Sequence, residues 1–205
     1  MSIEVQQEIA RKVLAKLEIL DPNAILAGGA PRDWFLGKEA RDLDFYIHLP
    51  NTQMCKQEGQ FKALGMSGTF MGTTRITGMY ATMVGLFRVY EMEYQGMSVQ
   101  VMIMKEPTFN SVVSQFGCST SKIWWKGKDV KPTPTFLLSM VNKVVFVSEG
   151  YTAKDSYVTK TMSYFPEFKA YGEDTLDAQL KQCARMNNFY PDWGCFLRWY
   201  KENRL

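Results

Sequence analysis

The stretch that decides the fold of this chain reads ILAGGAPRDWFLG over residues 25–37 and RDLDFYI over residues 41–47. The apolar run before Gly28 and Gly29 is short, as expected for a buried strand. Pro31 suits the first position of a helix, because the N–H group that it lacks has no partner there. The pattern predicts a strand, a glycine turn and a helix, followed by a second strand whose side chains alternate.

The glycine pair between strand and helix has a chemical use. Without side chains at Gly28 and Gly29, backbone N–H groups can approach a ligand closely. The start of the following helix adds unpaired donors and a partial positive charge, which suits a phosphate group. A plain tight turn would use the same two residues, so the glycines alone leave both interpretations open.

Asp42 and Asp44 lie two residues apart on the second predicted strand. Residues at this spacing point to the same face of a strand, so both carboxylates project to one place. Two such charges repel unless a cation lies between them, and Mg²⁺ prefers oxygen ligands of this kind. The alternative is structural: Asp42 caps the strand beside Arg41, and Asp44 forms a salt bridge.

Together these segments follow the order G-G-x-x-R-D-x-x-x-G and then D-x-D-F. This resembles the signature of the DNA polymerase beta-like nucleotidyltransferase superfamily. The similar members are the head domains of CCA-adding enzymes and poly(A) polymerases, and small proteins of bacteriophages and other viruses. A weaker similarity continues through residues 98–103, 115–117 and 125–128, and none is recognised beyond about residue 135.

The resemblance implies an α/β (α+β) fold, with a mixed sheet flanked by helices and a C-terminal helical segment. It also implies a nucleoside triphosphate held at the glycine turn and Mg²⁺ or Mn²⁺ bound by the aspartates. The acceptor would be an RNA end, a protein or a small molecule. The residues to which the resemblance gives a role are Gly28, Gly29, Arg32 and Asp33 for the nucleotide, and Asp42 and Asp44 for metal binding and catalysis.

Members of this superfamily normally have a third carboxylate on a later strand. Here Gln100 stands on the strand where an aspartate is expected, and Gly117 stands at the other slot that viral members use. Gln cannot accept a proton and is a poorer Mg²⁺ ligand than an anion. Glu91 and Glu93 are candidates for the missing carboxylate, because both lie on one face of the partner strand; glutamates facing solvent are the alternative.

The rest of the chain is assigned from periodicity. We expect helices over residues 2–20, 54–65 and 108–116, a loop over 65–78, a hairpin of strands 86–93 and 98–104, and a strand over 119–125. After Pro132 the signals are helical, over residues 135–146, 153–164, 174–186 and 193–203. These elements predict a nucleotidyltransferase-like core over residues 1–134 and a helical segment over 135–205 packed on it.

Composition excludes some classes of protein. The four cysteines are scattered and the chain has one histidine, which disfavours a structural zinc site. No apolar run is long enough to span a membrane, so we expect a cytoplasmic protein, in the host cytoplasm if a phage encodes it. The net charge of +3 permits nucleic-acid binding without arguing for it. His48 and the Trp124–Lys128 turn have both structural and ligand-binding interpretations.

Two functional hypotheses follow. The first is an active Mg²⁺-dependent nucleotidyltransferase, supported by the glycine turn and the retained pair Asp42 and Asp44. The second is a catalytically impaired relative, phage-encoded, that binds a nucleotide, a nucleic acid or a host protein. Gln100 and Gly117 together favour the second hypothesis.

Overall fold

The computed structural model describes residues 1–49, 56–70, 85–105, 109–148, 150–151 and 154–172. The chain divides into two compact units. The first contains residues 1–116 and 121–131, and the second contains residues 117–120 and 132–205. No helix among the described residues is long and apolar enough to cross a membrane.

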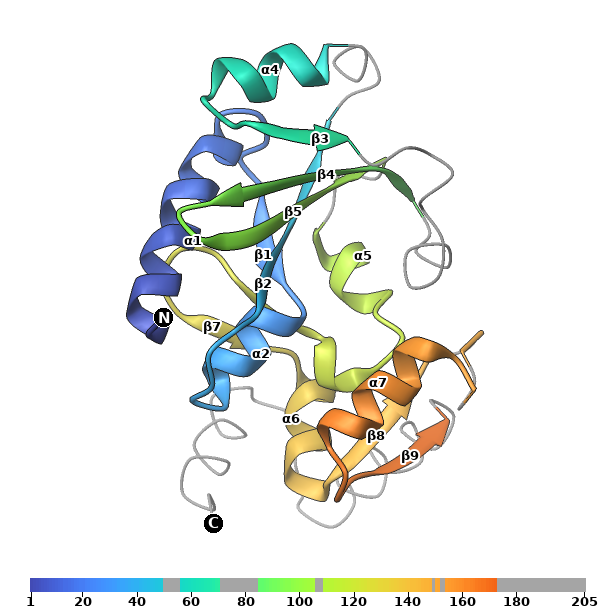
Figure 1. Ribbon diagram of the computed structural model, residues 1–205. Coiled ribbons are helices and arrows are strands. Elements are labelled where there is room, and N and C mark those ends of the chain that lie inside the picture. The colour runs from blue at the N-terminus through green and yellow to red at the C-terminus, as the bar shows by residue number, and fades with distance from the viewer. Residues whose placement is uncertain (50–55, 71–84, 106–108, 149, 152–153, 173–205) are drawn as a thin grey trace. The chain divides into compact units, whose positions relative to one another are not determined.

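The first unit is built on a seven-stranded sheet with the strand order β3-β4-β5-β2-β1-β6-β7 (Figure 1). Strands β2 and β5 pair in parallel, while β1–β2, β1–β6, β3–β4 and β4–β5 pair in antiparallel fashion. This mixed sheet with flanking helices confirms the predicted fold class. The strands are β1 (Ile25–Ala27), β2 (Asp42–His48), β3 (Gly68–Phe70), β4 (Leu86–Tyr94), β5 (Met97–Met104), β6 (Ile123–Trp125) and β7 (Val130–Pro132).

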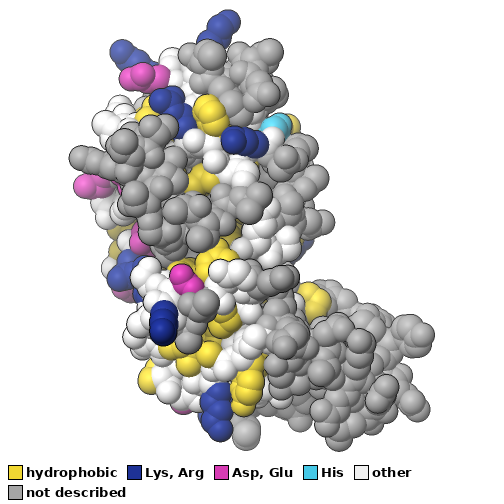
Figure 2. All heavy atoms as spheres, turned by 90° about the vertical axis from the view of Figure 1, so that its right-hand side faces the viewer, with side chains coloured by type: hydrophobic (Ala, Val, Ile, Leu, Met, Phe, Trp, Pro, Cys, Tyr) yellow, Lys and Arg dark blue, Asp and Glu magenta, His cyan; other side chains and the backbone are white. Residues whose placement is uncertain are grey.

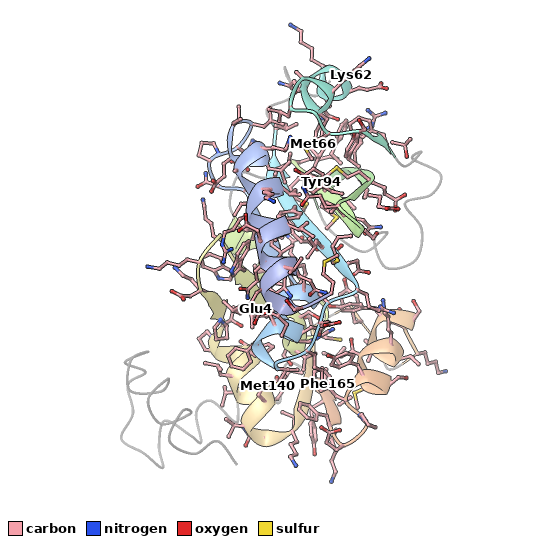
Figure 3. All side chains as sticks on the ribbon, turned by 60° about the vertical axis from the view of Figure 1, so that its left-hand side comes forward. Glu4, Lys62, Met66, Tyr94, Met140 and Phe165 are labelled. Carbon is pink, nitrogen blue, oxygen red and sulfur yellow. The ribbon has the colours of Figure 1, made fainter. Side chains whose placement is uncertain are left out.

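Helices cover both faces of this sheet (Figure 1). Helix α1 (Ile3–Glu18) lies along one face, as Figure 3 shows, and its buried side chains join the larger apolar cluster. Helix α5 (Phe109–Ser114) packs on the other face, within a smaller cluster. The other helices among the described residues of this unit are α2 (Gly29–Phe35) and α4 (Gln57–Ala63). Alternation along β2 and β5 therefore sends one set of side chains toward α1 and the other toward α5.

The β4–β5 hairpin confirms the expectation from the sequence. Its turn residues Gln95 and Gly96 both have positive φ, 51° and 80°. Turns of this kind match the right-handed twist of the flanking strands, and glycine adopts them readily. Strand β3 lies in a stretch for which we expected a loop, so that part of the prediction is wrong. A three-residue edge strand carries almost no local signal, since pairing with β4 creates it.

Two other boundaries differ from the expectation. Residues Ser119–Ser121 form a 3₁₀ turn, so the strand predicted from residue 119 begins only at Ile123. Helix α2 begins at Gly29, two residues before Pro31. Proline is tolerated there because the first four N–H groups of a helix have no partner within it.

The second unit contains α6 (Pro134–Asn142) and α7 (Ser156–Tyr164), together with the parallel strands β8 (Val144–Val147) and β9 (Lys169–Gly172). The helix predicted over residues 135–146 is therefore too long. Thr133 Oγ1 accepts a hydrogen bond from the Phe136 N–H at the start of α6, and Lys143, with φ of 53°, ends it. The helices predicted over residues 174–186 and 193–203 lie outside the described residues.

Candidate functional site

The glycine turn joins β1 to α2. Gly28 has φ of 87° and ψ of −122°, a conformation that residues with a side chain rarely adopt, and its N–H donates to the carbonyl of Ile123 at 2.9 Å. Gly29 is different, because it is the first helical residue and its φ is not positive. A Cβ at Gly29 would have only Arg32 Nη2 within 4 Å, at 3.9 Å. The described fold thus requires glycine at position 28 but not at position 29.

Asp42 and Asp44 occupy the start of β2. Both are partly buried. The alternate residues Leu43 and Phe45 are fully buried in the apolar cluster beneath α1. The two carboxylates therefore share the opposite face of the strand, as the spacing predicts. Continuing the β1–β2 register by one residue brings Ala27 opposite Asp44, so the glycine turn starts beside this pair.

Strand register aligns two further polar residues with Asp44. Asp44 lies opposite Gln100 in the parallel pairing of β2 with β5. Gln100 in turn lies opposite Glu91 in the antiparallel pairing of β5 with β4. Residues paired across neighbouring strands project to the same face, so Asp44, Gln100 and Glu91 form one row. The row contains a hydrogen bond from Gln100 Nε2 to Glu91 Oε1, of 2.7 Å.

A second row runs beside the first. Asp42 lies opposite Ser98, and Ser98 lies opposite Glu93. Ser98 and Glu93 are both exposed. The sheet thus presents four carboxylates on one face, two on β2 and two on β4. Strand β5 lies between them and has Gln100 and Ser98 at these positions. Glu91 and Glu93 share that face with the aspartates, and their role stays a prediction.

Gly117, the other slot for a third carboxylate, belongs to the second unit. A Cβ built there would lie 2.7 Å from two carbon atoms of the Tyr151 ring, closer than real Cβ atoms come to other atoms. Gly117 is buried, and its carbonyl accepts a hydrogen bond from the Ser148 N–H at 2.9 Å. The second unit therefore has no room for an aspartate at this position.

Arg32 and Asp33 form an ion pair within α2. Nε and Nη2 of Arg32 both lie 2.8 Å from Oδ1 of Asp33, and the two side chains are only 13% and 11% exposed. The guanidinium also lies beside Gly29, as the distance to a Cβ there indicates. The ion pair thus places the Arg32 guanidinium next to the glycine turn, with its orientation fixed by Asp33. A contact of Arg32 with phosphate stays a prediction.

Two residues that support this site were missed in the sequence analysis. Gln6, on the buried face of α1, binds both the N–H and the carbonyl of Ala40, two residues before Asp42. At the far end of β2, Asp21 Oδ2 accepts a hydrogen bond of 2.7 Å from the backbone N–H of His48. Gln6 could have been found as a polar residue on the otherwise apolar face of α1. Asp21 could not, because in the sequence it looks like part of a helix-ending Asp-Pro-Asn segment.

Two other residues from the sequence have structural partners. His48 Nδ1 lies 3.1 Å from the Met104 carbonyl and is six residues from Asp42, about 20 Å along an extended strand. Trp125 is fully buried, donates to the Lys128 carbonyl at 2.8 Å and meets Trp34 edge-on. Trp124 is partly buried, with Lys131 Nζ 5.0 Å from its ring centroid. Structural roles account for His48 and Trp125.

The side chains of the site fit a hard divalent cation that needs only one or two protein carboxylates. Among the described residues, no group of three or more His, Cys, Asp and Glu side chains is placed to hold a metal ion. The pair Asp42 and Asp44 offers oxygen ligands on one face, and Mg²⁺ commonly takes one or two carboxylates, with phosphates and water as its other ligands. On the face in Figure 2, the described Lys and Arg side chains are scattered and do not form one patch.

Comparisons with known proteins identify the fold. No protein-family model matches the sequence, and no curated protein matches it. Among solved structures, the chain is similar to a tRNA-processing enzyme in an apo form, with a TM-score of 0.52 and 14% identity, over 89% of this chain and 46% of that chain. It is also similar to a CCA-adding enzyme in complex with ATP, with a TM-score of 0.51 and 14% identity, over 86% of this chain and 41% of that chain.

The chain has a nucleotidyltransferase fold. The resemblance seen in the sequence is confirmed at that level, since the tRNA-processing enzyme and the CCA-adding enzyme share the architecture. The chain spans less than half the length of either of these neighbours. A closer relationship to phage or viral members stays a prediction.

Proposed function

We propose that this protein is a Mg²⁺-dependent nucleotidyltransferase that moves a nucleoside monophosphate from an NTP to a hydroxyl acceptor. One observation carries the proposal. Asp42 and Asp44 lie on the same face of β2, beside the turn at Gly28, in a nucleotidyltransferase fold. Two carboxylates that face the same way repel each other, which is a cost that a bound cation removes.

Asp42 and Asp44 are the residues that would hold Mg²⁺ or Mn²⁺. When bound there, such an ion supplies charge stabilisation at the attacking and leaving oxygens of an in-line displacement. The aspartates also fix where the phosphates lie, since their backbone belongs to a strand that is buried on its other face. Strands position such groups more accurately than loops do.

The glycine turn would bind the triphosphate. Gly28 is explained by its backbone conformation alone, but nothing in the described fold demands glycine at position 29. Close approach of a ligand to the backbone accounts for it. Arg32 and Asp33 would complete this part of the site, because the guanidinium beside Gly29 offsets phosphate charge while Asp33 holds it in place.

The reaction is a single displacement at the α-phosphorus. The acceptor oxygen forms a bond to that phosphorus, and the bond to the oxygen that bridges to the β-phosphate breaks. Pyrophosphate leaves with the electron pair of the broken bond, and the hydroxyl proton passes to water. Positioning and electrostatic stabilisation supply most of the catalysis in such reactions.

The acceptor we propose is an RNA end, with a protein side chain or a small molecule as the alternatives. The neighbours named above are a tRNA-processing enzyme and a CCA-adding enzyme bound to ATP. The second candidate function is binding without catalysis, to a nucleotide, a nucleic acid or a host protein. Gln100 in the row with Asp44 favours it, because a neutral amide replaces the anion expected there.

A labelling experiment tests the proposal and separates the two candidates. Purified protein is incubated with Mg²⁺ or Mn²⁺, each of the four NTPs and bulk RNA, with the label at either the α- or the γ-phosphate. We expect α-label, and no γ-label, to become attached to RNA or protein, with release of pyrophosphate. Asp44→Asn should abolish transfer. Nucleotide binding without transfer of α-label would support the second candidate, and neither binding nor transfer would contradict both.

A further inference from the structure

Strand β5 carries the amide of Gln100 at the point where a carboxylate would complete the site. Gln100 lies next to Asp44 in register, and it is held on its other side by Glu91 through the 2.7 Å hydrogen bond. All three side chains are partly buried, so solvent screens their interactions less than at an exposed surface. The amide thus lies between two acidic residues of the same row and is bonded to the one on β4.

The hydrogen bond determines how the amide is turned. An ionised carboxylate can only accept, so Gln100 must direct its NH₂ group at Glu91. The carbonyl oxygen, Oε1, is the atom of the amide that can then face a cation or a hydroxyl group.

Strand order places Gln100, and not Glu91, next to Asp44 in the row. Neighbouring strands lie about 4.8 Å apart, so the backbones at Asp44 and Glu91 are about 10 Å apart, with β5 between them. Oxygens that share one Mg²⁺ lie within about 4.2 Å of each other, twice the usual metal–oxygen distance of about 2.1 Å. Gln100 is one strand from each residue and spans the gap.

Register also separates Glu91 from Glu93, the other candidate. Glu93 is exposed and lies opposite Ser98, in the row of Asp42. The side chain of Ser98 is too short to bridge Glu93 and the aspartates, whereas Gln100 contacts Glu91 directly. The pair formed by Gln100 and Glu91 is therefore the unit that the structure offers in place of a third carboxylate.

We propose that Gln100 Oε1 serves as a neutral third ligand of the site, and that Glu91 is the positioning residue that fixes the amide for this role. The inference rests on the proposed function. It deepens that function by predicting a site that orients the acceptor hydroxyl without a protein base, since an amide cannot take up the proton. Partners that orient a ligand in this way typically contribute about 10- to 100-fold to metal affinity or activity.

Exchanging the two side chains tests this pair. The double variant E91Q/Q100E keeps a hydrogen bond between amide and carboxylate but moves the carboxylate one strand closer to Asp44. The single variant Glu91→Gln leaves two amides and no anion to orient them. The readouts are the affinity for Mn²⁺ alone, followed by EPR, and the kcat and KM of transfer, with thermal unfolding to show that each variant is folded.

We expect Glu91→Gln to weaken Mn²⁺ binding and to lower kcat by about tenfold or more, with little change in the KM for NTP. The exchange E91Q/Q100E should restore both to the wild-type level or above it. Unchanged Mn²⁺ affinity in all folded variants would indicate a purely structural role for the pair and would overturn the inference. An equal loss in Glu93→Gln would also overturn it, because removing any negative charge would then have the same effect.

Failure of the inference and failure of the proposed function give different results. If Asp44→Asn weakens Mn²⁺ binding while Glu91→Gln does not, the aspartate site stands and the role of Glu91 is wrong. If the wild-type protein and Asp44→Asn bind Mn²⁺ equally and neither transfers a nucleotide, the proposed function itself is wrong. The Mn²⁺ titration gives this answer even when no acceptor has been found.

Discussion

The indole nitrogen of Trp34 on α2 donates a hydrogen bond of 2.9 Å to Oε1 of Gln6 on α1. The same oxygen accepts from the N–H of Ala40 at 2.8 Å, and Gln6 Nε2 donates to the Ala40 carbonyl at 2.9 Å. Gln6 is 2% exposed, so these bonds form away from water. One side chain therefore ties α1 to the helix after the glycine turn and to the segment that leads into Asp42.

Replacing Gln6 by leucine should destabilise the protein by about 3 kcal/mol or more. The change leaves the Trp34 N–H and both polar groups of Ala40 buried without their partner, and each costs about 1–3 kcal/mol. Chemical denaturation measures the free energy of unfolding. Gln7→Leu, on the less buried neighbouring position, is the matched control and should stay within about 0.5 kcal/mol. Equal effects of the two variants would contradict a special role for Gln6.

The two glycines of the turn should respond differently to alanine. Gly28→Ala forces a side chain into φ of 87°, so we expect a loss of about 1–3 kcal/mol in unfolding free energy. Space is not the cause, because a Cβ at Gly28 would meet Phe116 at 3.9 Å, an ordinary contact. Gly29→Ala should fold with wild-type stability and yet bind NTP more weakly, which calorimetric titration would detect. Unchanged NTP binding by Gly29→Ala would count against a phosphate site at the turn.

Strand β3 depends on Gly68 in a way that is specific to its pairing. A Cβ there would lie 2.2 Å from the carbonyl oxygen of Glu91 and 2.7 Å from the Cβ of Met92. We expect Gly68→Ala to destabilise the protein by about 1–3 kcal/mol, since a backbone atom must move. Gly59→Ala, in helix α4 with no atom within 4 Å of its Cβ, should instead stabilise the protein by about 0.5–1 kcal/mol. Thermal unfolding of the two variants gives opposite shifts.

Much of the site was predictable from local patterns. A strand has a period of two, so the common face of Asp42 and Asp44 follows from their spacing alone. The β4–β5 hairpin follows from alternation and a Gln95–Gly96 turn. Neither pattern contains the parallel register of β2 with β5, because no turn joins those strands. The row of Asp44 with Gln100 therefore appears only in the structure.

The errors of prediction share a physical cause. Edge strand β3 exists because β4 pairs with it, and single-residue propensities do not carry that information. The apolar run Val144–Val147 continues the pattern of helix α6, but Lys143 in the left-handed region ends the helix and starts β8. Short apolar runs fit helix and strand equally well until a partner selects one.

Tyr90 should make the stability of the protein fall at high pH. Its side chain is 2% exposed and its hydroxyl donates to the Met66 carbonyl, and burial raises the pKa of Tyr90 above its ordinary value of 10.0. As pH rises, the unfolded chain therefore loses this proton first. The contribution is fully present below pH 10.0 and is lost as pH rises through the folded pKa. Urea unfolding at pH 8, 10 and 11 should show a shallower alkaline loss for Tyr90→Phe than for the wild type, and identical slopes would contradict the prediction.

Placing an aspartate at position 117, as the resemblance to viral nucleotidyltransferases suggests, should damage this protein. A Cβ at Gly117 would lie 2.7 Å from the Tyr151 ring, and the position is buried, so Gly117→Asp adds both a clash and an uncompensated charge. Overpacking alone costs about 1–3 kcal/mol, and the buried carboxylate adds to it. We expect no gain in transfer activity and a large loss in unfolding free energy.

A double-mutant cycle with Tyr151 isolates the steric part. In Tyr151→Ala, the ring that meets the new Cβ is absent, so Gly117→Ala should cost much less there than in the wild-type background. The difference between the two costs is the coupling energy, expected at about 1–3 kcal/mol for residues in contact. Additive effects would show that the ring does not restrict position 117. The absence of a carboxylate at position 117 would then need another explanation.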